Sequence, residues 1–373
     1  MGERHPPQTS RHQSTSTPTR DVPVREKIGQ MLIAGFKGLR VDPEHPIARD
    51  IQSYNLGGVI LYDRDVTTGS RERNIQSPSQ VKELTACLQA YSKELLLVSI
   101  DQEGGIVNRL PEASGFPPSV SAGVLGDLDD TERTRSEAVA VAASLAQAGI
   151  NLNMAPVVDL NVNPGNPVIG AKERSYSADP AIVIRHAAEF ITAHRDEGVL
   201  SCLKHFPGHG SSKMDSHLGM TDVSDTWTDK ELEPYRVLID KGMADSVMIS
   251  HVFQRRLDAS FPATLSSRII NNMLREEMAY DGVVISDDLQ MGAIARHFGL
   301  ETAFERTINA GTDLITLGNN LVYEGGLIGR AFDIIESLVD SGRVLPQQID
   351  GAYTRILRFK DRARHGRSSE LNG

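Results

Sequence analysis

The feature that most constrains this chain is a repeated alternation of short apolar runs with longer segments of helical period, from about Val22 onward. Each run is rich in Val, Ile and Leu and carries few polar residues, as is typical of strands buried on both faces of a parallel sheet. Eight runs have this character: 31–36, 58–62, 95–101, 151–159, 200–205, 246–252, 282–287 and 313–317.

Eight strands that alternate with helices predict an α/β fold of the (β/α)₈ TIM-barrel type, in a single domain. An open, doubly wound sheet is the alternative. That fold calls for a glycine fingerprint after the first strand, and Gly35-Phe36-Lys37-Gly38 matches it poorly.

The helical segments have boundary signals of their own. Asp179-Pro180 is typical of a helix start, and Gly198 of the end of the same helix. Further helices are expected at 131–148, at 267–278 with Ser266 as its cap, at 327–339 and at 348–362.

The length of 373 residues suits one large barrel domain, which we place at residues 22–364. Residues 1–21 are rich in Ser, Thr and Pro, so we expect a disordered N-terminal tail. Residues 365–373 are polar and are expected to form a frayed C-terminus.

Composition excludes several classes of protein. The formal charge of −10 argues against nucleic acid as a partner, and no apolar stretch is long enough to span a bilayer. With only Cys87 and Cys202, neither a disulfide scaffold nor a cysteine-rich metal site can form. The first residues lack the apolar run of a secretory signal, which predicts a cytoplasmic protein, and we expect a monomer or weak homo-oligomer.

In a TIM barrel, the functional residues lie at the carboxyl ends of the strands. Polar residues collect at five of the predicted strand ends, which is hard to explain by structural needs alone. They are the segments Asp101 to Gly105, Asp159 to Asn163, Lys204 to Gly210, Ser250-His251 and Ser286 to Asp288.

Asp287 directly follows the apolar residues of the seventh predicted strand. A carboxylate at such a position can act as a nucleophile or as a general base. The structural alternative is a cap for the following helix, and Asp288 fits that role at least as well. We therefore favour Asp287 as the functional member of the pair.

The segment after the fifth strand, residues 204–217, is dense in histidine. A metal site could be formed by His205, His209, Asp215 and His217. Alternatively, Asp215 could orient His217 and raise its basicity for acid/base chemistry. The glycines of the segment favour a mobile loop that carries an acid/base group over a rigid ligand cage.

Near the same rim, charged donors and an acceptor occur together, namely Asp101, Arg109, Arg174, Lys204 and His205. A carboxylate opposed by Arg and Lys donors can hold the hydroxyl groups of a sugar ring. The same residues could instead form a buried ion-pair network of structural importance.

With these residues identified, the chain resembles glycoside hydrolase family 3, and within it the single-domain bacterial β-N-acetylglucosaminidases. The resemblance covers about residues 22–362. The matching segments are Asp101-Gln102-Glu103-Gly104-Gly105, Ala155-Pro156-Val157-Val158-Asp159, Asn166-Pro167-Val168-Ile169-Gly170, Arg174-Ser175-Tyr176, Lys204-His205-Phe206-Pro207-Gly208-His209-Gly210, Asp215-Ser216-His217 and Ser286-Asp287-Asp288-Leu289.

The resemblance implies a retaining exo-β-N-acetylglucosaminidase that acts on muropeptide fragments of peptidoglycan during cell-wall recycling. By the same resemblance, Asp287 is the nucleophile, and His217 paired with Asp215 is the acid/base. No metal and no cofactor are implied. The positions that hold the sugar hydroxyls are Asp101, Arg109, Arg174, Lys204 and His205.

The sequence departs from the family pattern at a few positions. Ile106 stands where many relatives have Arg, and Met220 stands where Pro is frequent. These changes bear on aglycone specificity and loop closure more than on the chemistry.

Four alternative functions stay open at this stage. Two belong to the same family, a β-N-acetylglucosaminide phosphorylase and a β-glucosidase. Two are more remote, a metal-dependent barrel hydrolase and an inactive sugar-binding protein.

Overall fold

The computed structural model describes residues 22–215 and 219–366. The expected tail, residues 1–21, and residues 367–373 of the expected frayed end lie outside the described residues. The last helix, α11 (Pro346–Gly366), continues past residue 364, where we placed the end of the barrel domain.

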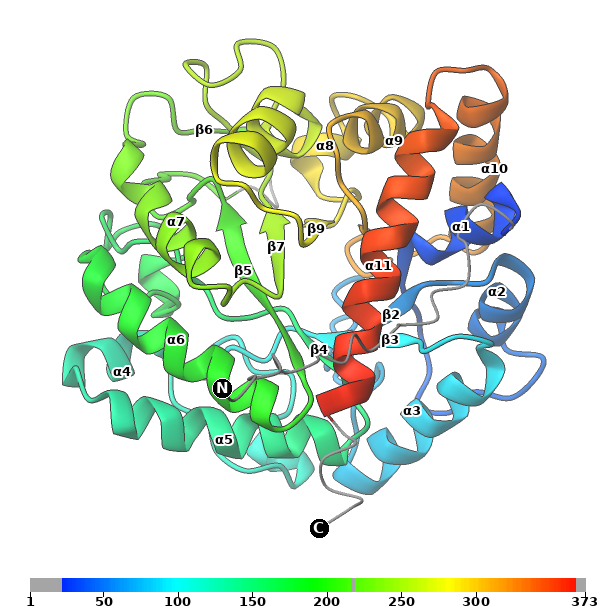
Figure 1. Cartoon of the computed structure of the whole chain (residues 1–373). Helices are drawn as coiled ribbons and strands as arrows, with labels where there is room; N and C mark the ends of the chain where they lie inside the picture. Colours follow the sequence, from blue (N-terminus) through cyan, green and yellow to red (C-terminus); the bar gives the residue numbers. More distant parts are fainter. Residues whose placement is uncertain (1–21, 216–218, 367–373) are drawn as a thin grey trace, which may run out of the picture.

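Eight parallel strands form one sheet that curves around the centre of the molecule (Figure 1). Their order is β10-β1-β2-β3-β4-β5-β7-β9, and a parallel bridge between Ile285 and Leu314 joins the two outer members, so the sheet closes. All eight predicted strands are thus confirmed. Their bounds are β1 (Leu32–Gly35), β2 (Gly58–Leu61), β3 (Leu97–Ile100), β4 (Leu152–Asn153), β5 (Leu200–Phe206), β7 (Ser246–Ile249), β9 (Val283–Ser286) and β10 (Ile315–Leu317).

Helices connect successive strands and pack around the outside of the sheet (Figure 1). The α-helices are α1 (Val24–Gln30), α2 (Pro46–Tyr54), α3 (Pro78–Tyr91), α4 (Ala122–Leu128), α5 (Thr131–Gln147), α6 (Pro180–Asp196), α7 (Glu233–Asp240), α8 (Gly292–Ala295), α9 (Leu300–Asn309), α10 (Leu327–Asp340) and α11. Short 3₁₀-helices are η2 (Glu112–Ser114), η3 (Gly170–Lys172), η4 (Asp229–Leu232) and η5 (Ala263–Leu265).

The helix signals read from the sequence are largely confirmed. The Asp179 carboxylate accepts the N–H of Ala181 at 2.9 Å at the start of α6, and Gly198 adopts a left-handed φ of 68° after its end. One element differs, because the segment expected as an α-helix at 267–278 forms a π-helix, η6 (Arg268–Glu277).

The strands are apolar because both of their faces are covered. Every residue of β1, β2, β3, β5, β7, β9 and β10 is buried. This explains why the strands appear in the sequence as continuous apolar runs without polar alternation.

A short parallel pair, β6 (Thr221–Asp222) with β8 (Val252–Phe253), was not predicted. It links the loop after β5 to the loop after β7, and the N–H of Val223 donates to the carbonyl of Phe253 at 2.9 Å. Two-residue strands leave no periodic signal in a sequence. This pair holds together two of the loops that border the candidate site.

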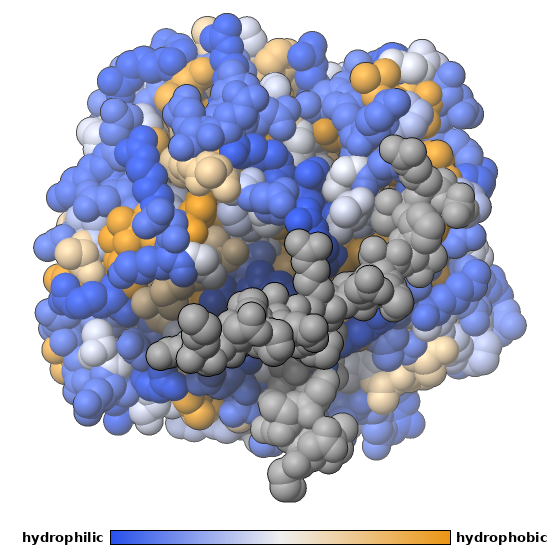
Figure 2. Space-filling model, in the orientation of Figure 1, coloured by the Kyte–Doolittle hydropathy of each residue, from blue (hydrophilic) through white to orange (hydrophobic). Residues whose placement is uncertain are grey.

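The face of the molecule drawn in Figure 2 is largely hydrophilic, with hydrophobic residues scattered among polar ones. Within residues 22–215 and 219–366, none of the helices has both the length and the hydropathy that a membrane crossing requires.

Candidate active site

A pocket opens at the carboxyl ends of the barrel strands, where the sequence predicts the functional residues. The fold therefore brings side chains from distant parts of the chain to one place. The pocket is lined by predicted site residues, namely Asp101, Arg109, Arg174, Lys204, His205 and Asp287, together with Tyr62, Glu103, Lys172, His209 and Asp288, among others.

Asp287 directly follows β9, and its half-buried side chain lines the pocket. Its backbone N–H donates to the carbonyl of Ile249 at 3.1 Å, which ties it to the end of β7. The neighbouring Asp288 is buried and accepts the N–H groups of Gln290 and Gly318, each at 3.0 Å. Asp288 thus joins the turn after β9 to the end of β10, while the cap position of α8 is held by another residue, Met291.

A buried ion-pair network forms the centre of the pocket. The Nζ of Lys204 contacts a carboxylate oxygen of Asp101 at 2.7 Å and one of Glu103 at 2.6 Å. Arg174 donates to both oxygens of Glu103, each at 2.7 Å. Burial by itself would raise the pKa of the Glu103 carboxyl, but the two cations outweigh it and hold the pKa well below its ordinary value.

The contacts of Arg174 leave little donor capacity for a ligand. A guanidinium has five N–H groups. Besides the two that bind Glu103, one donates to the carbonyl of Val168 at 3.2 Å and one faces the Nε2 of His205 at 3.3 Å. Four of the five are therefore engaged within the protein. Lys204 similarly has one of its three protons left for a hydroxyl group.

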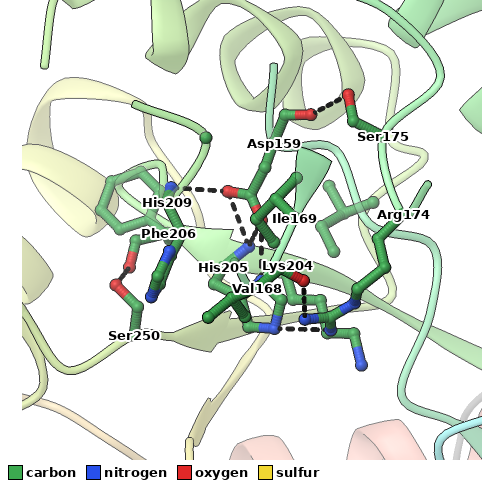
Figure 3. A network of polar contacts seen from close by, with 12 residues as sticks. Asp159, Val168, Ile169, Arg174, Ser175, Lys204, His205, Phe206, His209 and Ser250 are labelled. Atoms are coloured by element: carbon green, nitrogen blue, oxygen red, sulfur yellow. Dashed lines mark hydrogen bonds and ion pairs between the residues drawn. The ribbon is translucent and has the colours of Figure 1, made fainter. Parts of the chain in front are cut away.

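His205 lies between Asp159 and Arg174 (Figure 3). Its Nδ1 is 2.7 Å from a carboxylate oxygen of the fully buried Asp159, whereas its Nε2 faces the Arg174 guanidinium. Because Arg can only donate, Nε2 must accept, and Nδ1 carries the ring proton toward the carboxylate. His205 is consequently held as the neutral Nδ1–H tautomer.

Lys204 and His205 are consecutive, yet both side chains line the pocket. Successive side chains of a regular strand point to opposite faces. In β5 the pairing with β7 shifts register between Leu203 and Phe206, and the Lys204–His205 peptide bond is cis. Regular strand pairing is thus interrupted at these two residues, so the usual alternation of side chains does not apply to them.

Arg109 is positioned by the turn that follows β3. Gly104 and Gly105 adopt left-handed φ values of 99° and 61°, and a Cβ on Gly104 would lie 2.3 Å from the carbonyl oxygen of Val120. The Oε1 of Gln102 accepts the N–H of Arg109 at 2.9 Å, and the Arg109 guanidinium pairs with Asp63 at 3.2 Å.

The loop after β5 is fastened to its surroundings at its start. The Nδ2 of Asn166 donates to the carbonyls of His209 and Gly210 at 2.7 and 3.1 Å, and the indole N–H of Trp227 donates to the carbonyl of Pro207 at 2.9 Å. Burial lowers the pKa of His209 to about 4, so this imidazole is neutral at physiological pH.

A buried carboxyl lies beneath this loop. Glu231, in η4, is 1% exposed, and its Oε2 is 3.4 Å from the backbone nitrogen of Ser211. A Cβ on Gly208 would lie 2.7 Å from the Cβ of Glu231, which shows how closely the two segments pack. Burial raises the pKa of Glu231 to about 7.

The structure reaches only half of the predicted acid/base pair. Asp215 is half-buried and belongs to the loop after β5, whereas His217 lies outside the described residues. The role of the pair stays a prediction.

The metal site considered as an alternative includes His217, which lies outside the described residues. Within 22–215 and 219–366, no three His, Cys, Asp or Glu side chains are grouped as metal ligands. His205 in particular directs its Nε2 at a guanidinium, and a second cation at that nitrogen would meet strong repulsion.

The structure adds residues that we did not single out as site residues. Glu103 holds Arg174 and Lys204 in place, Asp159 holds His205, and Lys172 lines the pocket. Both acids lie at predicted strand ends, which was the available signal. Lys172 ends the short 3₁₀-helix η3 in the connection after β4, where no pattern marks it.

The arrangement suits the binding of a polar ligand and chemistry on it. It offers a carboxylate at the pocket wall, Asp287, and a few fixed donors around Asp101. A carboxylate in this position can attack an electrophilic carbon, and the fixed donors can select hydroxyl groups.

Comparison with known proteins gives a consistent result. The model of the Glycosyl hydrolase family 3 N terminal domain matches residues 23–359. Beta-hexosaminidase A of Pseudoalteromonas piscicida is 32% identical over 83% of this chain, which spans only 54% of that relative. Beta-hexosaminidase LpqI of Mycobacterium tuberculosis is 32% identical over 90% of this chain and 82% of that protein.

A solved structure of similar shape is the glycoside hydrolase family 3 beta-N-acetylglucosaminidase of Paenibacillus sp. str. FPU-7. It has a TM-score of 0.84 and 36% sequence identity, over 92% of this chain and 63% of that one. With the barrel, the pocket at its strand ends and a family match across nearly the whole described chain, this chain belongs to glycoside hydrolase family 3.

Proposed function

We propose that this protein is an exo-acting β-N-acetylhexosaminidase that releases terminal, non-reducing N-acetylglucosamine. The observation that carries the proposal is Asp287, which follows β9 and lines the same pocket as the Asp101–Lys204–Glu103–Arg174 network. Relatives that match most of this chain are named beta-hexosaminidases, which supports the choice of sugar.

In the proposed mechanism, Asp287 attacks the anomeric carbon and the bond to the leaving oxygen breaks, which gives a glycosyl-aspartate. His217, oriented by Asp215, donates a proton to the leaving oxygen. The same imidazole then takes a proton from water, which attacks the anomeric carbon and releases Asp287. Two inversions give net retention of configuration.

For sugar binding, we propose the residues predicted from the sequence: Asp101, Arg109, Arg174, Lys204 and His205. Their contacts assign different tasks to them. Asp101 keeps acceptor capacity for sugar hydroxyls, because a carboxylate has about four acceptor sites and Lys204 occupies one. Arg174 acts mainly through the position of Glu103 and His205.

The test is hydrolysis of paired aryl β-glycosides, an N-acetylglucosaminide and a glucoside, by wild type and D287N. We expect selective release from the N-acetylglucosaminide and a loss of roughly a thousand-fold or more in D287N, because the covalent step needs the carboxylate. The matched control is D333N, at an exposed aspartate of α10. Near-normal turnover by D287N would contradict the proposal, and preference for the glucoside would indicate a β-glucosidase.

The same assay with added phosphate separates hydrolysis from phosphorolysis. Formation of N-acetylglucosamine 1-phosphate would identify a phosphorylase, because the glycosyl-aspartate would then react with phosphate in place of water. The proposal expects free N-acetylglucosamine at every phosphate concentration.

The finer statements about biology stay predictions. They are the muropeptide origin of the substrate, the cytoplasmic location and the monomeric or weakly oligomeric state. Digestion of purified muropeptides, cell fractionation and sedimentation respectively would check them.

A further inference from the structure

Lys172 brings a charged amine to the pocket from outside the network described above. It is the last residue of η3, in the loop that follows β4, and its half-buried side chain lines the pocket together with that of Val168. The backbone of η3 is held by its own hydrogen bonds, including one from the N–H of Lys172 to the carbonyl of Ile169 at 3.3 Å.

The charge of Lys172 is not compensated in the way that the other cations of the pocket are. Arg109 pairs with Asp63, Arg174 with Glu103, and Lys204 with Asp101 and Glu103. Lys172 has no ion-pair partner within residues 22–215 and 219–366. A half-buried amine in such a place is suited to meet a negative charge supplied by a ligand.

The adjacent acid does not fill this role. Glu173 adopts a left-handed φ of 53°, and its carboxylate accepts the hydroxyl proton of Ser121 at 2.8 Å. The carbonyl of Glu173 also accepts the N–H of Gly123 at 2.9 Å. Both contacts direct Glu173 toward the start of α4, whereas Lys172 lines the pocket.

Burial indicates which part of a substrate Lys172 would meet. Arg174, two residues later, is 8% exposed, and its guanidinium is held by Glu103, which follows β3. Lys172 is more exposed than Arg174, so its side chain is nearer to solvent. In an exo-acting glycosidase, the terminal sugar fills the closed end and the leaving group extends toward solvent.

We infer that Lys172 forms an anion subsite that selects substrates with a carboxylate on the leaving group. The inference rests on the proposed function and adds to it the charge of the preferred aglycone. A lysine amine binds carboxylate as a point charge without demanding bidentate geometry, so it tolerates aglycones of different shape.

The experiment compares two aryl N-acetylglucosaminides that differ in charge but little in size, with a 3-carboxyphenyl and a 3-carbamoylphenyl leaving group. The measured quantity is the ratio of their kcat/KM values, carboxylate over carboxamide. Because the pair is partly exposed, we expect a ratio of roughly 3 to 10 in wild type, carried mainly by KM and reduced by salt.

Three variants test whether Lys172 causes the preference for the carboxylate substrate. K172Q should lower the ratio to about 1, and K172R should keep most of it because the charge is retained. K241Q, at an exposed lysine before β7 and hence at the opposite end of the barrel, should leave the ratio as in wild type. A ratio that K172Q does not change would overturn the inference.

A third substrate, phenyl N-acetylglucosaminide phosphorylated at C6 of the sugar, tests which part of the substrate carries the anion that Lys172 binds. If Lys172 promoted turnover of this compound and not of the carboxyphenyl one, the subsite would serve the terminal sugar and the inference would be wrong. If wild type cleaved none of the three substrates, the proposed function would be refuted, and the subsite with it.

Discussion

Glu231 shows how a single buried side chain can give a barrel of this type a pH-dependent stability. Its unfolded carboxyl loses a proton near pH 4.5 and its folded one near pH 7. Between these values the folded state holds a proton that the unfolded state has released. The free energy of unfolding is therefore expected to fall as pH rises from about 4.5 to about 7. Above pH 7 it stays lower by the full amount.

The prediction is tested with E231Q, whose amide resembles the protonated acid. At pH 8 we expect E231Q to exceed wild type in unfolding free energy by up to about 3 kcal/mol, with the advantage vanishing near pH 4.5. Urea denaturation at both pH values measures it, with E277Q as the surface control. An equal difference at both pH values would show that folding does not raise the pKa of the Glu231 carboxyl.

For single residues, the sequence predicted which side chains lie at the pocket better than it predicted which residues they pair with. Strand-end position alone predicted Asp101, Lys204 and Asp287, because the carboxyl ends of barrel strands share one rim. The pairing of Glu103 with Arg174 joins residues 71 positions apart, which no local pattern encodes. Lys204 and the residue after it both line the pocket where the pairing of β5 with β7 shifts register, and the sequence does not signal that shift.

The loop after β5 depends on glycine for a steric reason. A Cβ on Gly210 would lie 1.8 Å from the carbonyl oxygen of Leu160, whereas a Cβ on Gly219 in the same loop has no atom of the described residues 22–215 and 219–366 within 4 Å. The two positions form a natural pair for an experiment, because the same substitution meets backbone at one and open space at the other.

We expect G210A to displace the loop and with it Asp215. Its kcat/KM on an aryl N-acetylglucosaminide should fall on the order of 100-fold, and its unfolding free energy by about 1–3 kcal/mol. G219A should resemble wild type in both assays. Equal behaviour of the two variants would mean that the loop adapts without affecting the site.

For whole elements, apolar strands and amphipathic helices were predictable from the sequence. A π-helix and a pair of very short strands were not. The π-helix η6 has the same apolar spacing over its length as an α-helix would, so periodicity cannot distinguish them. The pair β6–β8 is too short for any periodic signal. Both exceptions belong to connections between barrel strands, where tertiary contacts decide the local conformation.

The end of the barrel opposite the pocket contains a buried ion-pair cluster around Asp313. Asp313 precedes β10, at the end opposite the pocket, and is fully buried. It accepts the N–H of Val284 in β9 at 2.8 Å and pairs with Arg275 and Arg355, each at 2.8 Å. One carboxylate thus joins β9, η6 and α11 where the sheet closes.

D313N should consequently affect stability and not chemistry. We expect the unfolding free energy to fall by about 3 kcal/mol, because two arginines lose their counter-charge, while kcat measured at 15 °C stays at the wild-type value. D281N, which removes an exposed partner of Arg358, should cost less than about 1 kcal/mol. A fall in kcat of folded D313N would show that the barrel end is coupled to the pocket.

The nearly complete use of the donors of Arg174 and Lys204 has a consequence for affinity. Both side chains are ordered by Glu103 before any sugar arrives, so the conformational entropy of these long, flexible groups is lost when the chain folds. The few donors that these side chains keep are already fixed in position when a sugar binds, so binding does not bear that entropic cost again.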